Sequence, residues 1–158
     1  MGELSVQQRY APQSICFGCG PANAKGLRIE SFESDAATGE LVAEFVPQPH
    51  HEAFPGMLNG GIIGTLLDCH CNWTAAVFLM HRAGSESPPC TVTASYSVQL
   101  QRPTPSSGPL SLRAHVDDVR HDKKVQVVGT LAAQGKVCAT CTGTFVAVEP
   151  GHPAYHRW

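Results

Sequence analysis

One carboxylate, Asp68, stands inside a long apolar stretch, GGIIGTLLDCHCNWTAA, that a pair of glycines opens. Burying a charged group among leucines and isoleucines is costly unless a partner or a reaction uses it. A carboxylate in such a place is a candidate general base or nucleophile. The structural alternative is that Asp68 lies at a helix contact and accepts a hydrogen bond from Thr65 or Asn72.

The residues around Asp68 predict a single helix over residues 60 to about 81. Asn59 is a good N-cap residue, the stretch contains no proline, and AGSESPP ends it. At 100° per residue, Asp68 shares its face with small or polar residues, namely Gly61, Gly64, Thr65, Asn72 and Ala75. The opposite face is apolar and is expected to pack on a sheet: Ile62, Ile63, Leu66, Trp73, Val77 and Met80.

The glycine pair has a chemical consequence. Gly60 and Gly61 leave the first helical N–H groups uncovered by side chains, and these groups carry the positive end of the helix dipole. Such a terminus suits an oxyanion or a carbonyl that is being polarised. Asp68 lies about 10.5 Å along the axis from Gly61, whereas both groups must come within roughly 3–3.5 Å of one reacting carbon. One helix cannot supply both, so the sequence predicts a dimer with a shared site.

Strand-like segments flank the helix. LRIESFES and GELVAEFVP precede it, and the proline-bearing loop PQPHHEAFPGMLN leads into it. Four strands follow over TVTASYSVQLQRP, PLSLRAHVDDV, KVQVVGTLAA and KVCATCTGTFVAVE, and their short connections predict an antiparallel meander. The order predicts an α+β domain over residues 27–148, with a lead-in segment over residues 1–26 and a tail over residues 149–158.

The first strand after the helix alternates between apolar and polar residues. Alternation places Thr93 on the face away from the core, together with its polar neighbours Ser95, Ser97, Gln99 and Gln101. The other face carries Val92, Ala94, Tyr96, Val98 and Leu100.

Composition excludes several classes of protein. The 158 residues, 42% hydrophobic and 15% charged, suit one ordinary globular domain. A formal net charge of -2 offers no basic surface, so we expect neither a nucleic acid nor a membrane as partner. The N-terminus has no secretory pattern, and seven cysteines are an odd number. Reduced thiols and a cytoplasmic location are therefore expected.

Two C-x-x-C pairs raise the question of zinc. Cys16 and Cys19 lie in a glycine-rich turn, the usual place for a zinc knuckle, whereas Cys138 and Cys141 lie three apart on a strand and point to opposite faces. Cys69 and Cys71 do not converge on the helix, and the histidines show no ligand spacing. We therefore predict small buried thiols, no metal site and no cofactor.

The motifs together resemble a known family. FPGMLNGGIIGTLLD resembles the HGG…D signature of hotdog-fold acyl-CoA thioesterases of the PaaI type, CFGCGPANAKGL resembles a lead-in of one branch of that group, and QRPTP sits at a familiar strand end. The resemblance implies a hotdog fold, a curved antiparallel β-sheet wrapped around one long central α-helix. It implies homodimers that pair into homotetramers, and hydrolysis of coenzyme A thioesters.

The resemblance also assigns roles to residues. Asp68 corresponds to the catalytic carboxylate, either as general base or as nucleophile. The Gly61 N–H, given by the partner subunit, corresponds to the oxyanion donor, with Gly60 beside it. Thr93 falls where some relatives place a hydroxyl that helps to hold the water. One departure is Asn59, which stands where the family has histidine and can still cap the helix and hydrogen-bond near the thioester.

Further residues are candidates for binding the substrate. His51 and Glu52 occupy the loop where relatives place polar groups, although such residues are often simply solvated. Phe54 and Met57, with Trp73, Phe78 and Leu79 of the helix, suggest an apolar acyl pocket. The phosphates of coenzyme A could meet basic residues that are as readily solvated: Arg102, Arg120, Lys123 and Lys124.

Three functions remain in competition. An acyl-CoA or aryl-CoA thioesterase is favoured, because Asp68 is kept on a face of small residues. The alternative is a non-catalytic ligand-binding protein with the same fold, in which Asn59 reflects lost chemistry. An enoyl-CoA hydratase is disfavoured, because such enzymes resemble one another in an Asp and a His five residues apart, and here that second position is Trp73.

Overall fold

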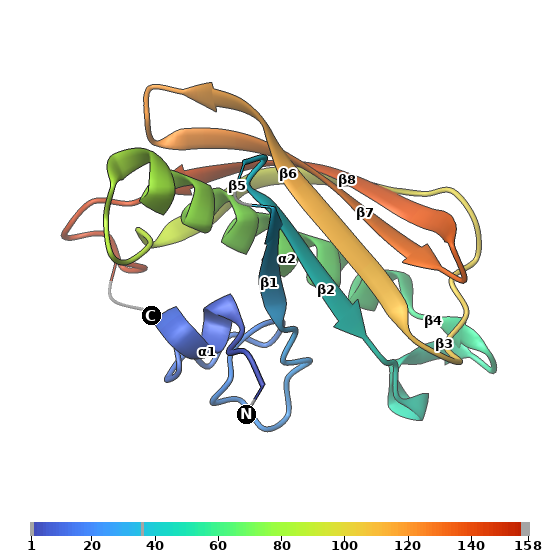
Figure 1. Ribbon diagram of the computed structural model, residues 1–158. Helices are drawn as coiled ribbons and strands as arrows, with labels where there is room; N and C mark the ends of the chain where they lie inside the picture. Colours follow the sequence, from blue (N-terminus) through green and yellow to red (C-terminus); the bar gives the residue numbers. More distant parts are fainter. Residues whose placement is uncertain (1, 36, 156–158) are drawn as a thin grey trace.

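The computed structural model describes residues 2–35 and 37–155, and in them a curved six-stranded sheet wraps one long helix, α2 (Figure 1). The helices are α1 (Val6–Tyr10), the 3-10 turn η1 (Pro49–His51) and α2 (Gly60–Ala83). The strands are β1 (Ser31–Asp35), β2 (Glu40–Phe45), β3 (Glu52–Phe54), β4 (Met57–Leu58), β5 (Thr91–Leu100), β6 (Leu110–Arg120), β7 (Lys124–Ala133) and β8 (Lys136–Ala147). This arrangement confirms the predicted α+β hotdog architecture.

The six strands lie in the order β1-β2-β6-β7-β8-β5, and every neighbouring pair is antiparallel. Strands β6, β7 and β8 form a meander as predicted. The prediction that β5 continues that meander is wrong, because β5 pairs with β8 at the edge of the sheet, where Thr91 lies opposite Ala147. The chain between β5 and β6 therefore passes the ends of β8 and β7.

A β-bulge reverses the faces of β5. The register shifts between Thr93 and Ser95, which leaves Ala94 as the extra residue. Before the bulge the Thr93 side chain faces α2, and after it the Tyr96 side chain does. The prediction that Thr93 points away from the core is wrong, because strict alternation holds only in an unbroken ladder.

Helix α2 has the predicted start and nearly the predicted end. The Asn59 side-chain oxygen accepts hydrogen bonds from the backbone N–H groups of Gly61 and Ile62, which satisfies two of the unpaired donors of the first turn. The helix ends at Gly84, whose φ of +64° is a left-handed conformation that glycine adopts without strain. The prediction of one long helix with Asn59 as its N-cap is confirmed.

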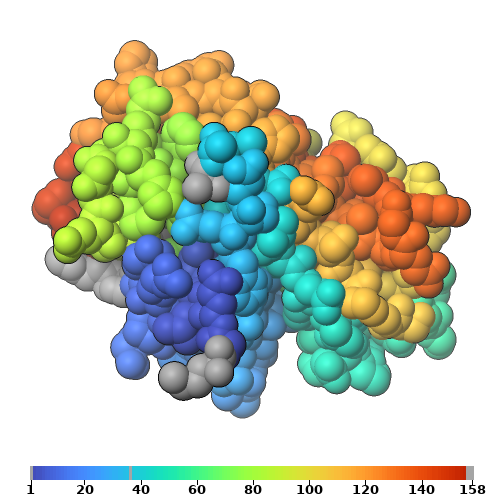
Figure 2. Space-filling view, viewed as in Figure 1, coloured from blue at the N-terminus to red at the C-terminus, as the bar shows by residue number. Residues whose placement is uncertain are grey.

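Two layers cover α2. The sheet covers one side, and the N-terminal segment (residues 2–30) lies against the other (Figures 1 and 2). Trp73, predicted to pack on the sheet, is buried, but its indole N–H donates to the Cys19 sulfur of that segment at 3.3 Å.

By length and composition alone α2 could cross a membrane, yet 67% of its apolar stretch is buried in the fold, as in a core helix.

The N-terminal segment contains a short helix, α1, that its apolar residues do not reveal. The Ser5 hydroxyl accepts a hydrogen bond from the Gln8 N–H, and the Gln8 side chain accepts one from the Ser5 N–H. This reciprocal capping box is encoded in the spacing of Ser5 and Gln8, and that spacing is the signal that would have predicted the helix.

A buried polar chain ties the N-terminal segment to α2 and β2. Gln7 donates to the Ser31 hydroxyl at 3.0 Å, and Ser31 lies 2.8 Å from Nδ1 of His70. Nε2 of His70 lies 3.0 Å from the Leu41 carbonyl oxygen, which can only accept. His70 is therefore held as the neutral tautomer with its proton on Nε2. Burial lowers the pKa of His70 to about 4.

This pKa makes stability depend on pH. The unfolded chain takes up a proton on His70 below about pH 6.5, whereas the folded chain resists it until about pH 4. Stability should therefore fall as the pH drops through that window, by up to about 1.4 kcal/mol per pH unit from this group. The His70→Gln variant should be less stable at pH 7 but show a flatter decline between pH 6.5 and 4 in urea unfolding.

The exposed His115 supplies the control for this measurement. His115→Gln should decline with the wild-type slope. An unchanged slope in His70→Gln would show that another group causes the acid sensitivity.

Candidate functional site

Asp68 lies at the middle of α2 and is half-buried. The hydroxyl of Thr93 donates a hydrogen bond to its Oδ1 at 2.7 Å. The bulge in β5 makes this contact possible, because it turns Thr93 toward the helix. The sequence thus brings together the two residues predicted to handle water, although the alternation argument placed them apart. Of the two residues considered as structural partners of Asp68, Thr65 donates its hydroxyl to the Gly61 carbonyl and Asn72 donates its amide to the Thr91 carbonyl.

The small-residue face of α2 lies beside β5. A methyl group added at Gly60 would lie 3.5 Å from the Leu100 side chain, and one at Gly64 would lie 3.8 Å from the Tyr96 hydroxyl. Together with Asp68 and Thr93, these contacts show that α2 and β5 run antiparallel. Tyr96 is 48% exposed and presents its hydroxyl over this face, a position that the alternation of β5 did not predict.

At the start of α2, the predicted N-cap residue contacts the predicted oxyanion donor. Oδ1 of Asn59 lies 2.8 Å from the Gly61 nitrogen and 3.2 Å from the Ile62 nitrogen. The cap therefore occupies the Gly61 N–H that was predicted to face an oxyanion. A substrate oxygen at that position must compete with the Asn59 side chain, whereas the Gly60 N–H precedes the capped donors.

A cavity of about 320 Å³ opens at this end of the helix. Its walls combine the start of α2 with the β3–β4 hairpin and the segment after β5: Phe54, Met57, Leu58, Gly60, Ile63, Leu100, Gln101, Arg102, Pro103 and Thr104. Three predicted substrate-binding residues, Phe54, Met57 and Gly60, thus line one cavity. Arg102 adds a positive charge to the wall.

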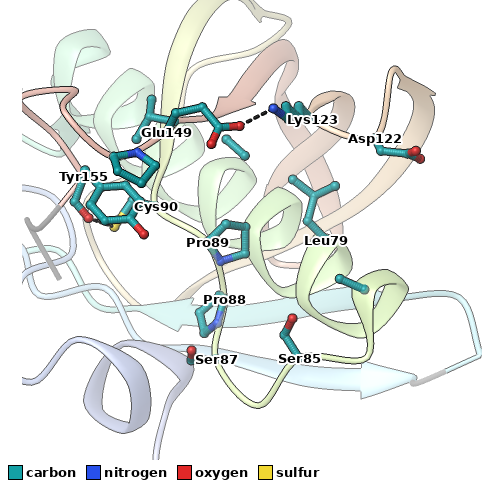
Figure 3. Close-up of a pocket in the computed structure, with 14 residues that line it drawn as sticks. Leu79, Ser85, Ser87, Pro88, Pro89, Cys90, Asp122, Lys123, Glu149 and Tyr155 are labelled. Atoms are coloured by element: carbon teal, nitrogen blue, oxygen red, sulfur yellow. Dashed lines mark hydrogen bonds and ion pairs between the residues drawn. The ribbon is translucent and has the colours of Figure 1, made fainter.

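A larger cavity of about 620 Å³ lies at the other end of α2 (Figure 3). Leu79, Cys90 and Tyr155 are among the residues that line it, and Leu79 lies about 16 Å along the axis from Asp68. The predicted grouping of Phe54 and Met57 with the helix residues Trp73, Phe78 and Leu79 is therefore wrong, because none of the three lines the cavity at the start of the helix. We assign the smaller cavity to the site, because only that one adjoins the helix start.

Glu52 and His51 are held by contacts outside this cavity. Glu52 accepts a hydrogen bond from the Ser106 hydroxyl at 2.6 Å. Nδ1 of His51 accepts one from the Gln48 N–H at 3.0 Å. Burial lowers the pKa of His51, and the neighbouring His50 lowers it further. These contacts favour a structural task, in which both residues fix the segment that enters α2.

A group able to hold a metal ion occurs among the described residues at Cys16, Cys19 and Cys69. Cys138 and Cys141 do not join it. Both are buried, because a bulge at Cys138 breaks the alternation that would place them on opposite faces. Cys138 donates a hydrogen bond to the Lys136 carbonyl, and the thiols of Cys141 and Cys71 are hydrogen-bonded to each other.

The cap of α2 can be tested by stability. Asn59→Ala removes the acceptor of two N–H groups of the first helical turn and should lower the free energy of unfolding by about 1 kcal/mol. Asn59→Asp keeps the acceptor and adds a negative charge at the positive end of the helix, so it should be at least as stable as the wild type. Urea unfolding checks both. An Ala variant as stable as the wild type would show that the cap contributes nothing.

Comparison with known proteins places the fold. No family model matches this sequence, and no curated protein does. Among solved structures, a thioesterase superfamily protein from Shewanella loihica PV-4 is 29% identical, with a TM-score of 0.64, over 82% of this chain and 98% of that one. A phenylacetic acid degradation-related protein from Ralstonia eutropha JMP134 is 26% identical, with a TM-score of 0.66, over 80% and 90% of the two chains.

The PaaI protein of Escherichia coli, from the phenylacetic acid degradation operon, is 17% identical, with a TM-score of 0.66, over 81% of this chain and 85% of that one. At that identity the match shows the fold alone. Motif, architecture and structural neighbours agree with one another. The chain thus has the hotdog fold of the thioesterase superfamily, and its resemblance to PaaI-like thioesterases is confirmed.

Proposed function

We propose that this protein is an acyl-CoA thioesterase in which Asp68 assists the attack of water on the thioester. The observation that carries the proposal is the hydrogen bond of Thr93 to a half-buried carboxylate on an otherwise small-residue helix face. A binding protein has no need of that charge, and burying it costs free energy. The structural neighbours described as thioesterases support the reaction class.

Asp68 would take a proton from water as the water attacks the thioester carbon, or attack that carbon itself. In either case Thr93 fixes one carboxylate oxygen, which limits the orientations that the group can adopt. The hydroxyl of Tyr96 lies beside Gly64, one helical turn before Asp68 on the same face of α2, and would be a second hydrogen-bond donor to the substrate. General-base assistance is worth roughly 10²–10⁴ in rate.

The other half of the site would come from a partner subunit. Strand β5 is the edge of the sheet, and no strand among the described residues pairs with its outer side. It exposes two large hydrophobic side chains, those of Tyr96 and Leu100. Its ten residues leave a long unpaired edge, and such an edge can pair with a strand of another chain. Two β5 edges that pair around a two-fold axis would form an isologous homodimer.

The two-fold axis that pairs the β5 edges can also bring Asp68 close to the start of the partner's helix. An axis that brings Asp68 to the partner subunit's Gly61 must pass midway between these residues, beside Gly64. Gly64 lies next to Tyr96, near the middle of β5. One axis therefore satisfies the pairing of the strands and the approach of carboxylate to helix start. A homotetramer built from two such dimers stays part of the proposal.

The substrate would enter the cavity at the helix start. Its apolar wall at Phe54 and Met57 suits the acyl or pantetheine part, and Arg102 suits a phosphate of coenzyme A. Two other basic residues considered for this task already have partners: Arg120 lies 3.0 Å from Asp118, and Lys123 pairs with Glu149.

One observation favours the alternative, a ligand-binding protein without catalysis. The Gly61 N–H, the proposed oxyanion donor, already donates a hydrogen bond to the Asn59 side chain in the free chain. Catalysis requires that the thioester oxygen displace the cap or use the Gly60 N–H. Loss of this stabilisation would cost roughly 10²–10³ in rate.

The first test is hydrolysis of a panel of acyl-CoA and aryl-CoA esters by the wild type and by Asp68→Asn. The variant should lose at least about a hundredfold in kcat with little change in stability, because the amide cannot act as a base. The loss of thioester absorbance is the readout, since a thiol reagent would also react with the protein's cysteines. The exposed Asp117→Asn on β6 is the matched control and should be fully active. Tight binding of an ester without turnover would establish the binding protein instead.

The shared site predicts complementation between two inactive variants. Asp68→Asn lacks the base, and Gly61→Pro lacks the N–H. Proline suits the first turn of a helix, and its Cβ, which would lie 2.9 Å from Oδ1 of Asn59, displaces that exposed side chain. When the two chains are co-expressed with different tags, each mixed dimer has one intact site of two. Mixed dimers isolated by both tags should therefore have about one half of the wild-type activity, and the unseparated random mixture about one quarter. Activity no higher than that of either variant alone would place both groups in one chain.

A further inference from the structure

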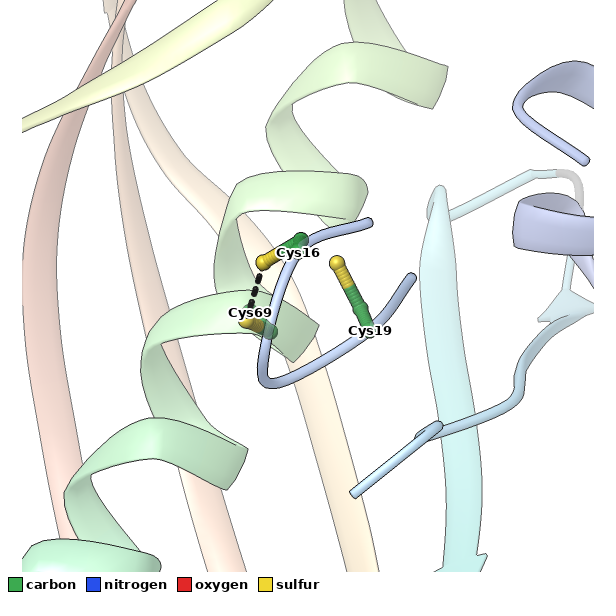
Figure 4. Close-up of side chains that lie close together, drawn as sticks. All are labelled: Cys16, Cys19 and Cys69. Atoms are coloured by element: carbon green, nitrogen blue, oxygen red, sulfur yellow. Dashed lines mark hydrogen bonds between the residues drawn. The ribbon is translucent and has the colours of Figure 1, made fainter. Parts of the chain in front are cut away.

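Three cysteine thiols from distant parts of the chain meet beside α2, apart from the cavity described above. Cys16 and Cys19 stand at the two ends of a tight turn in the N-terminal segment, and Cys69 lies on the helix that this turn faces (Figure 4). Their sulfur atoms all lie within 4.8 Å of one another, and those of Cys16 and Cys69 are 3.8 Å apart. The sequence prediction of no metal site considered Cys16 and Cys19 without Cys69.

The backbone of the turn is fitted to this meeting of thiols. The Gly20 N–H donates to the Cys16 carbonyl at 2.8 Å, which closes the turn. A side chain at Gly18 would lie 2.3 Å from the Cys69 sulfur, so only glycine lets the turn approach the helix so closely. The turn is therefore built to bring two thiols onto a third.

The spacing of the sulfurs fits a tetrahedral metal site. Zn²⁺ binds thiolate sulfur at about 2.3 Å, which places two sulfurs of one tetrahedron about 3.8 Å apart. The distance between Cys16 and Cys69 has this value. C-x-x-C followed by a distant ligand is also the spacing of structural zinc sites.

One of the three sulfurs already accepts a hydrogen bond from an N–H group. The indole N–H of Trp73 donates to the Cys19 sulfur. N–H donors of this kind commonly support metal-bound thiolates from outside the coordination sphere.

We propose that Cys16, Cys19 and Cys69 bind one Zn²⁺ ion that fastens the N-terminal segment to the middle of α2. On binding, all three thiols release their protons to solvent and coordinate as thiolates. Cys19 and Cys69 are buried, whereas Cys16 is half-buried, so a water on the Cys16 side would supply the fourth ligand of a tetrahedral ion. The ion would act structurally and does not depend on the proposed thioesterase activity.

The experiment uses the full chain, reduced with a phosphine, stripped of metal by a chelator and then titrated with Zn²⁺ or Co²⁺. One equivalent of Zn²⁺ should bind, and the melting temperature should rise by on the order of 5–10 °C at saturating metal. Co²⁺ should give the intense thiolate-to-metal charge-transfer band and the visible absorption of a tetrahedral site. No variant is needed for these readouts.

Variants assign the ligands. Cys16→Ser, at a half-buried position, should abolish the charge-transfer band and the rise in melting temperature while the protein stays folded. Cys90→Ser is the matched control, because the Cys90 thiol donates to the Tyr155 carbonyl and a serine hydroxyl can do the same. It should bind one equivalent of metal as the wild type does.

Two results would overturn the proposal. One is the absence of stoichiometric metal in the reduced protein, or binding that Cys16→Ser leaves unchanged. The other is a disulfide between Cys16 and Cys19 or Cys69, found by mass spectrometry of protein purified without reductant, together with no affinity for Zn²⁺ after reduction. The cluster would then be a redox pair rather than a metal site.

Discussion

The rest of the structure depends on how one long apolar helix is kept from water. α2 has more apolar surface than one sheet can cover, so the sheet takes one side and the N-terminal segment takes another, through Trp73 and the Gln7–Ser31–His70 chain. Between these two covers the helix presents small residues, and there Asp68 is only half-buried. The carboxylate is tolerated in an apolar helix because it lies on the partly exposed small-residue face and because Thr93 donates a hydrogen bond to it.

The same helix start serves two purposes that compete. Unpaired N–H groups must be satisfied when no ligand is present, and Asn59 does this for Gly61 and Ile62. A ligand oxygen that takes the place of Asn59 therefore gains only the difference between two hydrogen bonds. The benefit of the helix dipole is smaller in this protein than in one whose first turn lacks a capping side chain, unless the ligand oxygen carries a full charge.

Much of the fold could be read from the sequence, and the errors have identifiable causes. The helix was predictable because proline is absent and both ends carry capping residues, Asn59 and Gly84. The face of Thr93 was not, because a bulge at Ala94 leaves no mark in an alternating sequence. The pairing of β5 with β8 was missed because a short connection favours neighbouring strands but does not require them. The meeting of Cys69 with Cys16 depends on tertiary packing between residues 53 positions apart, which local spacing cannot show.

The position of β5 in the sheet has a consequence for the order of folding. β5 is made directly after α2, but its only strand partner among the described residues is β8, the last strand of the chain. Until residues 136–147 have left the ribosome, β5 has no ladder to join, and Thr93 has nothing to hold it against Asp68. Pairings between strands so distant in sequence also form slowly, because the loop between them must close first. The half of the site that lies within one chain is therefore assembled at the end of folding, after the core around α2 has formed.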